Sequence, residues 1–130
     1  MADDKKAIEA TVQTYLDGLY EGDVDKLASA FHPTAALTWE DKGEIKIWPR
    51  EEWLDVMRKR SSPKADGLER GDEILSIDQA SPTTAFVKLK CQIPPRYFTD
   101  YLNLLKVDGR WQVVQKIFTA EVREAKAGAA

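Results

Sequence analysis

Two residues with the chemistry of a general acid or base occupy informative positions in this chain. Asp100 opens the largely apolar stretch DYLNLLKVDGRWQVVQKIF, and His32 is the only histidine. A carboxylate among apolar side chains is costly unless it is paired, hydrated or protonated, and burial there would make it a usable base. We therefore predict Asp100 and His32 as a candidate catalytic acid–base pair. The alternatives are that the His32 ring bonds a backbone carbonyl at a helix end and that Asp100 meets solvent at the rim of the fold.

Aromatic residues form the second candidate group. Tyr15, Trp39, Trp48 and Trp53 lie on segments that should face a common interior. Such residues are either plain core aromatics or the walls of a pocket for a planar aromatic ligand, with the tyrosine hydroxyl and indole N–H groups as donors. The full candidate ligand-binding set is Tyr15, Phe31, Trp39, Trp48, Trp53, Leu102, Val113 and Gln115.

Other functional signals are missing from the sequence. It has no phosphate loop, zinc-ligand spacing, nucleophile elbow or dinucleotide fingerprint, so we expect no cofactor and no metal. The net charge is −3 with both signs interleaved, and no basic patch or long apolar run stands out, so we expect no nucleic-acid partner and no membrane partner. The single cysteine, Cys91, alternates with Val87 and Leu89, which predicts a buried, inert thiol and suits the reducing cytoplasm.

The segment around Asp108-Gly109 predicts a β-hairpin, because Asp-Gly between apolar runs favours a two-residue turn with positive φ at both residues. Counting outward from this turn gives the register of the two strands. The predicted pairs on one face are Lys106 with Trp111, Leu104 with Val113, Leu102 with Gln115, and Asp100 with Ile117.

The other face of this hairpin is also apolar. We expect a homodimer through this outer sheet face, because a large exposed apolar patch is unusual on a monomer. The apolar residues assigned to the outer face are Tyr101, Leu105, Val107, Val114 and Phe118. By the same count Tyr101 opposes Lys116, and Lys88, Lys90 and Lys116 point outward to solvent or to a dimer interface.

The rest of the sequence predicts the helices and strands that position these residues. The order is helix (3–20), short helix after Asp23 ended by His32-Pro33, strand (34–39), strand (44–48), helix from Pro49, loop (61–71), strands (72–79 and 83–93), and the hairpin. Strands in a run after a helical start indicate an α+β fold, here a cone-shaped, curved, mostly antiparallel sheet around three helices of the N-terminal half. We expect one domain over residues 1–130, with residues 1–5 and 121–130 frayed.

The opening AIEATVQTYLDGLYEGDVDKLASAFHPTAALTW, followed at the end by DYLNLLKVDGRWQVVQKIF, resembles the nuclear-transport-factor-2-like superfamily, which has a cystatin-like fold. The resemblance covers residues 6–121 and is greatest to the "putative lumazine-binding" group, beside the SnoaL-like cyclases. The resemblance implies the same cone-shaped sheet around three helices. It also implies that any active site would use Asp and His residues inside the cone. The superfamily includes isomerases, dehydratases, epoxide hydrolases, cyclases, transport adaptors and members of unknown activity, so the resemblance does not decide whether this chain is an enzyme.

Three functions are therefore compatible with the sequence. The first, which we favour, is a small-molecule-binding protein with an apolar, aromatic-lined pocket and no turnover. The second is a cofactor-free isomerase, dehydratase or cyclase that uses the Asp100/His32 pair. The third is a protein-interaction module that uses the outer sheet face.

Overall fold

A computed structural model describes residues 4–123. It contains three helices and six strands in the predicted order. They are α1 (Lys5–Glu21), α2 (Val24–Ala30), β1 (Phe31–Asp41), β2 (Glu44–Pro49), α3 (Arg50–Lys59), β3 (Glu73–Ser81), β4 (Thr84–Ile93), β5 (Arg96–Val107) and β6 (Arg110–Val122). The α+β prediction is confirmed.

The helices form where the apolar spacing predicts them. One face of α1 is buried through residues three or four apart: Ile8, Val12, Tyr15, Leu16 and Leu19. Gly22 ends α1 in the left-handed region at φ 71°, and Asp23 caps α2 by accepting a hydrogen bond from the Lys26 amide at 3.2 Å. The first two helices therefore reverse over two residues and pack together against the sheet.

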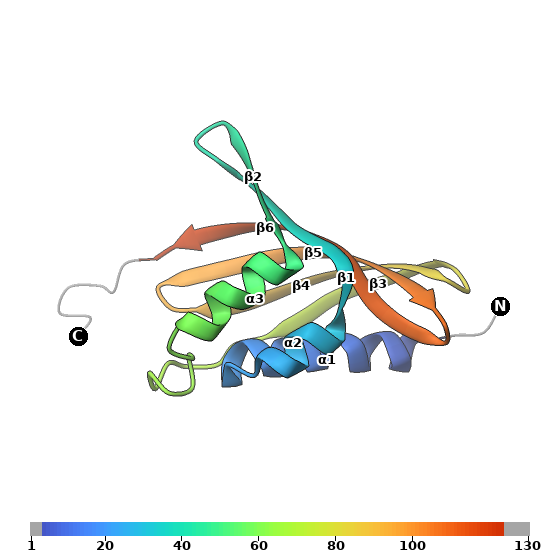
Figure 1. Ribbon diagram of the computed structural model, residues 1–130, viewed down its shortest axis with the longest axis horizontal. Helices are drawn as coiled ribbons and strands as arrows, with labels where there is room; N and C mark the ends of the chain where they lie inside the picture. The colour runs from blue at the N-terminus through green and yellow to red at the C-terminus, as the bar shows by residue number, and fades with distance from the viewer. Residues whose placement is uncertain (1–3, 124–130) are drawn as a thin grey trace.

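The six strands form one sheet in the order β2-β1-β6-β5-β4-β3. All neighbours are antiparallel except β1 and β6, which are parallel. The three helices lie on one face of this twisted sheet (Figure 1), and we call that face the inner face and the opposite one the outer face. The strand β4 alternates as predicted, with Ala85, Val87, Leu89 and Cys91 buried on the inner face.

The β5–β6 turn has the predicted form, with Asp108 at φ 52° and Gly109 at φ 75°. The pairs next to it, Lys106 with Trp111 and Leu104 with Val113, are confirmed. Beyond them the predicted register is wrong, because β6 contains one extra residue, Val114, between the partners of Leu104 and Asn103. Such a bulge places two residues of one strand opposite one residue of the other.

The bulge reverses the face assigned to every later residue of β6. Asp100 pairs with Phe118, Leu102 pairs with Lys116, and Tyr101 pairs with Ile117. The predicted outward positions of Lys116 and Phe118 are therefore wrong, since both side chains share the inner face with Asp100. Gln115 and Ile117 move to the outer face in exchange.

Two differences from the predicted element boundaries concern residues singled out above. The chain passes directly from α2 into β1 at Phe31, so His32 lies in a strand rather than at a helix end. Regular structure includes Lys5 and continues in β6 to Val122, within the ends that we expect to fray. The expectation for residues 1–3 and 124–130 lies outside the described residues.

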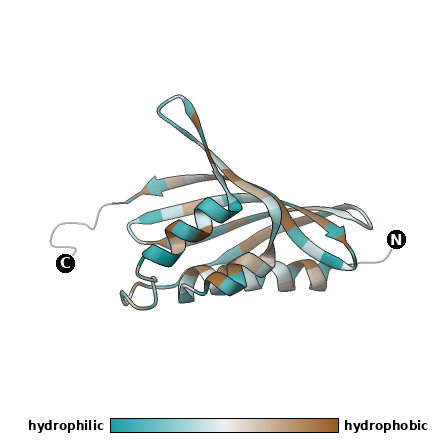
Figure 2. Ribbon diagram, viewed as in Figure 1, coloured by the Kyte–Doolittle hydropathy of each residue, from teal (hydrophilic) through white to brown (hydrophobic). Residues whose placement is uncertain are grey.

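The hairpin of β1 and β2 projects from the body of the sheet (Figure 1), and its tip is hydrophilic (Figure 2). Near its base the hairpin carries two tryptophans on the inner face. The rings of Trp39 and Trp48 meet edge to face at 5.0 Å, and Trp39 lies 5.3 Å from the ring of Phe118. The hairpin thereby extends the apolar inner surface beyond the helices.

Candidate functional site

A buried polar cluster joins α1 to the inner face of β5 and β6. The Tyr15 hydroxyl donates a hydrogen bond to Asp100 Oδ2 at 2.5 Å, and Lys116 Nζ donates to the Tyr15 oxygen at 2.7 Å. Lys116 Nζ also lies 3.6 Å from Asp100 Oδ2, which makes a buried ion pair. Asp100 is fully buried, and only 7% of the Lys116 side chain is exposed. Removing two charges from water in this way is costly. Buried charged groups of this kind are concentrated at functional sites.

The ammonium group of Lys116 is surrounded by aromatic rings. Nζ lies 5.0 Å from the ring centre of Tyr15, 5.7 Å from that of Trp53 and 4.8 Å from that of Phe118. A cation over aromatic faces is stabilised by the ring quadrupole, the more so when it is desolvated. These rings therefore offset part of the cost of burying the charge.

The same burial keeps two neighbouring acids protonated. Burial, and then the Asp100 carboxylate, raises the pKa of Tyr15 well above its ordinary value, so this residue stays a phenol. Burial, and then Asp100, also raises the pKa of the Cys91 thiol. Its sulfur lies 3.9 Å from Asp100 Oδ2 and contributes a weak hydrogen bond. The prediction that Cys91 is buried is confirmed, and its raised pKa argues against a reactive thiolate.

A cavity of about 440 Å³ opens above this cluster, and we call it the aromatic cavity. Tyr15, Cys91 and Lys116 form part of its lining, while Asp100 lies behind them. The rings that line it are Tyr15, Trp39, Trp48, Trp53, Phe98 and Phe118. Its size lies within the range of ligand pockets, and apolar walls with a few convergent polar groups are typical of small-molecule sites.

The aromatic cavity is also lined by charged side chains of both signs. Arg60 follows α3 and Arg96 begins β5, and both are exposed. Glu40 and Asp41 contribute carboxylates from the β1–β2 hairpin. These exposed charges interact with solvent, so the buried Lys116 is the group that distinguishes the interior of the cavity.

The remaining predicted ligand-binding residues lie elsewhere. Phe31, Leu102 and Val113 are fully buried in the core, and Phe31 supports the site from behind by packing against the rings of Tyr15 and Trp53 at 5.3 and 4.8 Å. Gln115 lies outside the aromatic cavity, because the bulge turns it to the outer face, where its amide donates to the Thr38 hydroxyl at 3.1 Å.

The proposed pairing of Asp100 with His32 is not supported by the contacts of either residue. His32 Nδ1 interacts with Thr34, at 2.7 Å from its hydroxyl and 3.1 Å from its amide nitrogen. Within the described part of the chain, the side-chain partners of Asp100 are Tyr15, Lys116 and Cys91. His32 follows the inward-facing Phe31, and successive side chains of a strand point to opposite faces.

Lys116 is the buried charged residue of the site that the sequence prediction missed, and Phe98 and Phe118 are lining rings that it also missed. Strict alternation from the Asp108-Gly109 turn sends Lys116 outward, and Val114 carries no local signal of a bulge. One signal was available nonetheless. A carboxylate on an apolar face requires a cation, and Lys116 is a lysine on the paired strand within two residues of the position opposite Asp100.

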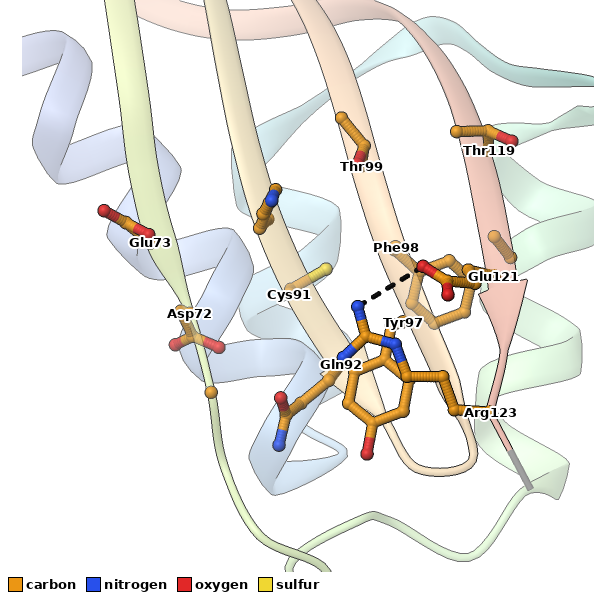
Figure 3. Close-up of a pocket in the computed structure, with 13 residues that line it drawn as sticks. Asp72, Glu73, Cys91, Gln92, Tyr97, Phe98, Thr99, Thr119, Glu121 and Arg123 are labelled. Atoms are coloured by element: carbon orange, nitrogen blue, oxygen red, sulfur yellow. Dashed lines mark hydrogen bonds and ion pairs between the residues drawn. The ribbon is translucent and has the colours of Figure 1, made fainter. Parts of the chain in front are cut away.

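A second hollow, of about 480 Å³, lies at the ends of the strands β3 to β6 (Figure 3). Here the guanidinium of Arg123 lies 4.3 Å from the ring centre of Tyr97 and pairs with Glu121 at 3.3 Å. Its charged groups are largely solvated, whereas the aromatic cavity holds a buried ion pair. We therefore place the candidate site in the aromatic cavity.

Among the helices of residues 4–123, none is long and apolar enough to span a membrane. In the same residues no group of three or more His, Cys, Asp or Glu side chains is arranged to hold a metal ion.

The fold and the cavity define the class of protein. A nuclear-transport-factor-2-like protein of unknown function from Shewanella baltica superimposes with a TM-score of 0.83 and 28% identity, over 92% of this chain and 95% of that one. A protein from Novosphingobium aromaticivorans that is named as a scytalone dehydratase superimposes with a TM-score of 0.66 and 17% identity, over 95% of this chain and 90% of that one. At this identity the similarity supports a shared fold and nothing about activity. The chain is thus nuclear-transport-factor-2-like, as predicted.

The family can be stated more closely. Residues 3–119 match the family model described as "Putative lumazine-binding", and this chain belongs to that family. Among curated proteins it is similar to the protein named aldolase FrzH from Cladobotryum sp., with 29% identity over 114 residues, which are 86% of this chain and 87% of that protein.

Proposed function

We propose that the protein binds a small, largely apolar and planar organic molecule in the aromatic cavity, with an acceptor oxygen of the ligand at Lys116. The observation that carries this proposal is a buried amine that borders an aromatic-lined cavity. An ammonium group has three N–H donors, and the hydrogen bond to Tyr15 uses one of them. The remaining donors favour a carbonyl, enolate or carboxylate oxygen, because hydrogen bonds from a charged donor are the stronger ones.

The family description supports a ligand of this kind. A lumazine is a flat bicyclic molecule with carbonyl oxygens, which suits rings on the walls and a donor at the end of a pocket. Stacking on Trp39, Trp48 or Trp53 would hold the plane of such a molecule, and Lys116 would fix its orientation. Any planar aromatic carbonyl compound of similar size has the same features, so we propose the chemical class rather than one compound.

A second candidate function is cofactor-free catalysis at a carbonyl compound. The observation that favours it is the charged cluster of Asp100, Tyr15 and Lys116, together with the similarity to an aldolase-named protein. Aldol reactions and carbonyl isomerisations share an enolate, whose negative oxygen is stabilised by a preorganised cation in a water-poor site. Lys116 would provide this stabilisation, and Asp100 would hold Tyr15 and Lys116 in position.

The outer face of the sheet supports a further proposal, a homodimer. A row of paired residues crosses this face, and its apolar members are exposed: Ile47 (56%), Ile117 (49%) and Tyr101 (39%). Apolar side chains along a sheet face commonly mark an association surface. If the chain is monomeric instead, the same face is available to another protein. We also retain the expectation of a cytoplasmic location, which suits a free, buried Cys91.

The binding proposal is tested with two matched naphthalenes. 2-Acetonaphthone carries a carbonyl group, whereas 2-ethylnaphthalene has nearly the same shape without the oxygen. Titration calorimetry should give tighter binding of the ketone by about 1.5–3 kcal/mol, the range of a hydrogen bond to a charged donor. In Lys116→Met the two ligands should bind alike. Absence of binding by both compounds, or a preference of Lys116→Met for the ketone as large as that of the wild type, would refute the proposal.

A further inference from the structure

The environment of Lys116 is that of a reactive amine as well as of a hydrogen-bond donor. Its nitrogen borders the aromatic cavity, while the carbon chain is buried between α1 and the sheet. The other basic residues that line the cavity, Arg60 and Arg96, carry guanidinium groups that stay charged and are poor nucleophiles. Lysines held in apolar pockets are the usual carbonyl-capturing nucleophiles of proteins.

A lysine must release a proton before it can attack a carbonyl carbon, and Asp100 is placed to receive it. Asp100 Oδ1 is buried and has no hydrogen-bond donor within the described residues. The nearest carboxylate oxygen, Oδ2, lies 3.6 Å from Lys116 Nζ, and the hydrogen bonds of the Tyr15 hydroxyl link the two groups. The proton therefore has a direct route from Lys116 to Asp100 and a second route through Tyr15.

We propose that Lys116 is a nucleophilic lysine that forms an imine with the carbonyl carbon of an aromatic ketone or aldehyde bound in the aromatic cavity. This inference rests on the binding function proposed above and specifies the chemistry of the same site.

The step balances without an oxidant or a reductant. The Nζ lone pair forms a C–N bond to the carbonyl carbon, and the electron pair of the C=O bond moves to the oxygen, which takes up a proton. At the same time the nitrogen releases one proton, which gives a neutral carbinolamine. Its hydroxyl group then takes up a proton and leaves as water, and the nitrogen lone pair forms the C=N bond of a protonated imine on Lys116. Tyr15, whose oxygen lies 2.7 Å from Nζ, and protonated Asp100 are the groups positioned to exchange these protons.

Formation of an imine would extend the chemistry available to this pocket. A protonated imine withdraws electrons from the neighbouring carbon more strongly than a ketone does. Loss of the adjacent proton then becomes easier, which is the first event in an aldol reaction. The assignment thus gives the catalytic candidate function a specific nucleophile, with Asp100 as a positioning and proton-holding residue.

The experiment traps the imine with 2-acetonaphthone and sodium cyanoborohydride, which reduces a protonated imine to a stable secondary amine. Intact-mass measurement should show one adduct per chain, and peptide mapping should place it on Lys116. Lys116→Arg and Lys116→Met should lose this adduct. Lys90→Arg, which changes an exposed lysine outside the aromatic cavity, should retain it.

Asp100→Asn tests the role of the proton acceptor. Asparagine keeps an oxygen for the Tyr15 hydroxyl but cannot accept the lysine proton. The adduct should form about 100-fold more slowly, the low end of a general acid–base effect. The two rates are compared at ketone concentrations that saturate each protein, as measured without reductant by quenching of tryptophan fluorescence, so weaker binding does not enter the comparison.

The two arms separate failure of the inference from failure of the proposed function. Ketone binding without an adduct, or with adducts only on exposed lysines of the wild-type chain, would overturn the assignment of Lys116 and leave the binding function standing. Absence of both quenching and adduct would overturn both. Because the mapping is done on the wild-type chain, the result does not depend on the folding of any variant.

Discussion

Lys116→Met should be among the most destabilising substitutions at this site. It removes the cation that faces a fully buried carboxylate, one oxygen of which already lacks a donor. Removing one partner of a buried ion pair costs about 3–5 kcal/mol, because the other charge remains buried and uncompensated. Asp100→Asn should cost less, since the lysine left behind borders the cavity and contacts three aromatic rings. Asparagine can also accept the Tyr15 hydrogen bond.

A double-mutant cycle in urea measures this effect. The variant with both substitutions should be more stable than the sum of the single changes predicts, by about 2–3 kcal/mol, since neither charge is left alone. The exposed pair of Arg58 and Asp55 on α3 is the matched control, with an expected coupling below about 1 kcal/mol. A Lys116→Met cost within about 1 kcal/mol of wild type, or a coupling no larger than that of the control, would refute the account of the buried cluster.

Three further predictions concern other parts of the chain. Burial and Asp100 raise the pKa of Tyr15 in the folded protein above that of an unfolded tyrosine, which is about 10. The free energy that Tyr15 contributes to folding is therefore complete below about pH 10 and is lost as the pH rises further. The stability difference between wild type and Tyr15→Phe should therefore narrow above pH 10 in urea titrations, and a constant difference would contradict the assignment. Burial raises the pKa of Cys91, so its thiol should react with a disulfide reagent at pH 8 much more slowly in the folded protein than in urea, and equal rates would contradict the burial of this thiol. Sedimentation at micromolar concentration should give a dimer that Ile117→Lys dissociates, whereas the control Lys59→Gln, an exposed residue of α3 on the opposite face of the sheet, does not. A wild-type monomer would exclude this interface.

Much of the fold could be predicted from local patterns. The stripe on α1, the reversal at Gly22 and Asp23, and the Asp108-Gly109 turn each have a direct physical signal, and each is present in the structure. Together they specify the order of helices and strands. The parallel pairing of β1 with β6 depends on contacts between distant segments, for which local spacing provides no evidence.

The site could be predicted only in part, because one bulged residue changes which side chains meet. The sequence predicts Asp100 and Tyr15 as site residues, but it pairs Asp100 with His32 rather than with Lys116. Alternation along β6 holds from the turn to Val113 and fails at Val114, where two valines in succession give no sign of an irregular ladder. A rule that required a cation near each inward carboxylate would have corrected the register and identified Lys116.

A crystal structure with 2-acetonaphthone soaked into the protein would show whether the amine of Lys116 meets the carbonyl carbon of a ligand inside the aromatic cavity. We expect the naphthalene ring against the tryptophans of the cavity wall, with its carbonyl group within about 3 Å of Lys116 Nζ or joined to it. A ketone bound on the outer face of the sheet, or one in the cavity with its oxygen directed toward Arg60 and Arg96, would contradict this expectation.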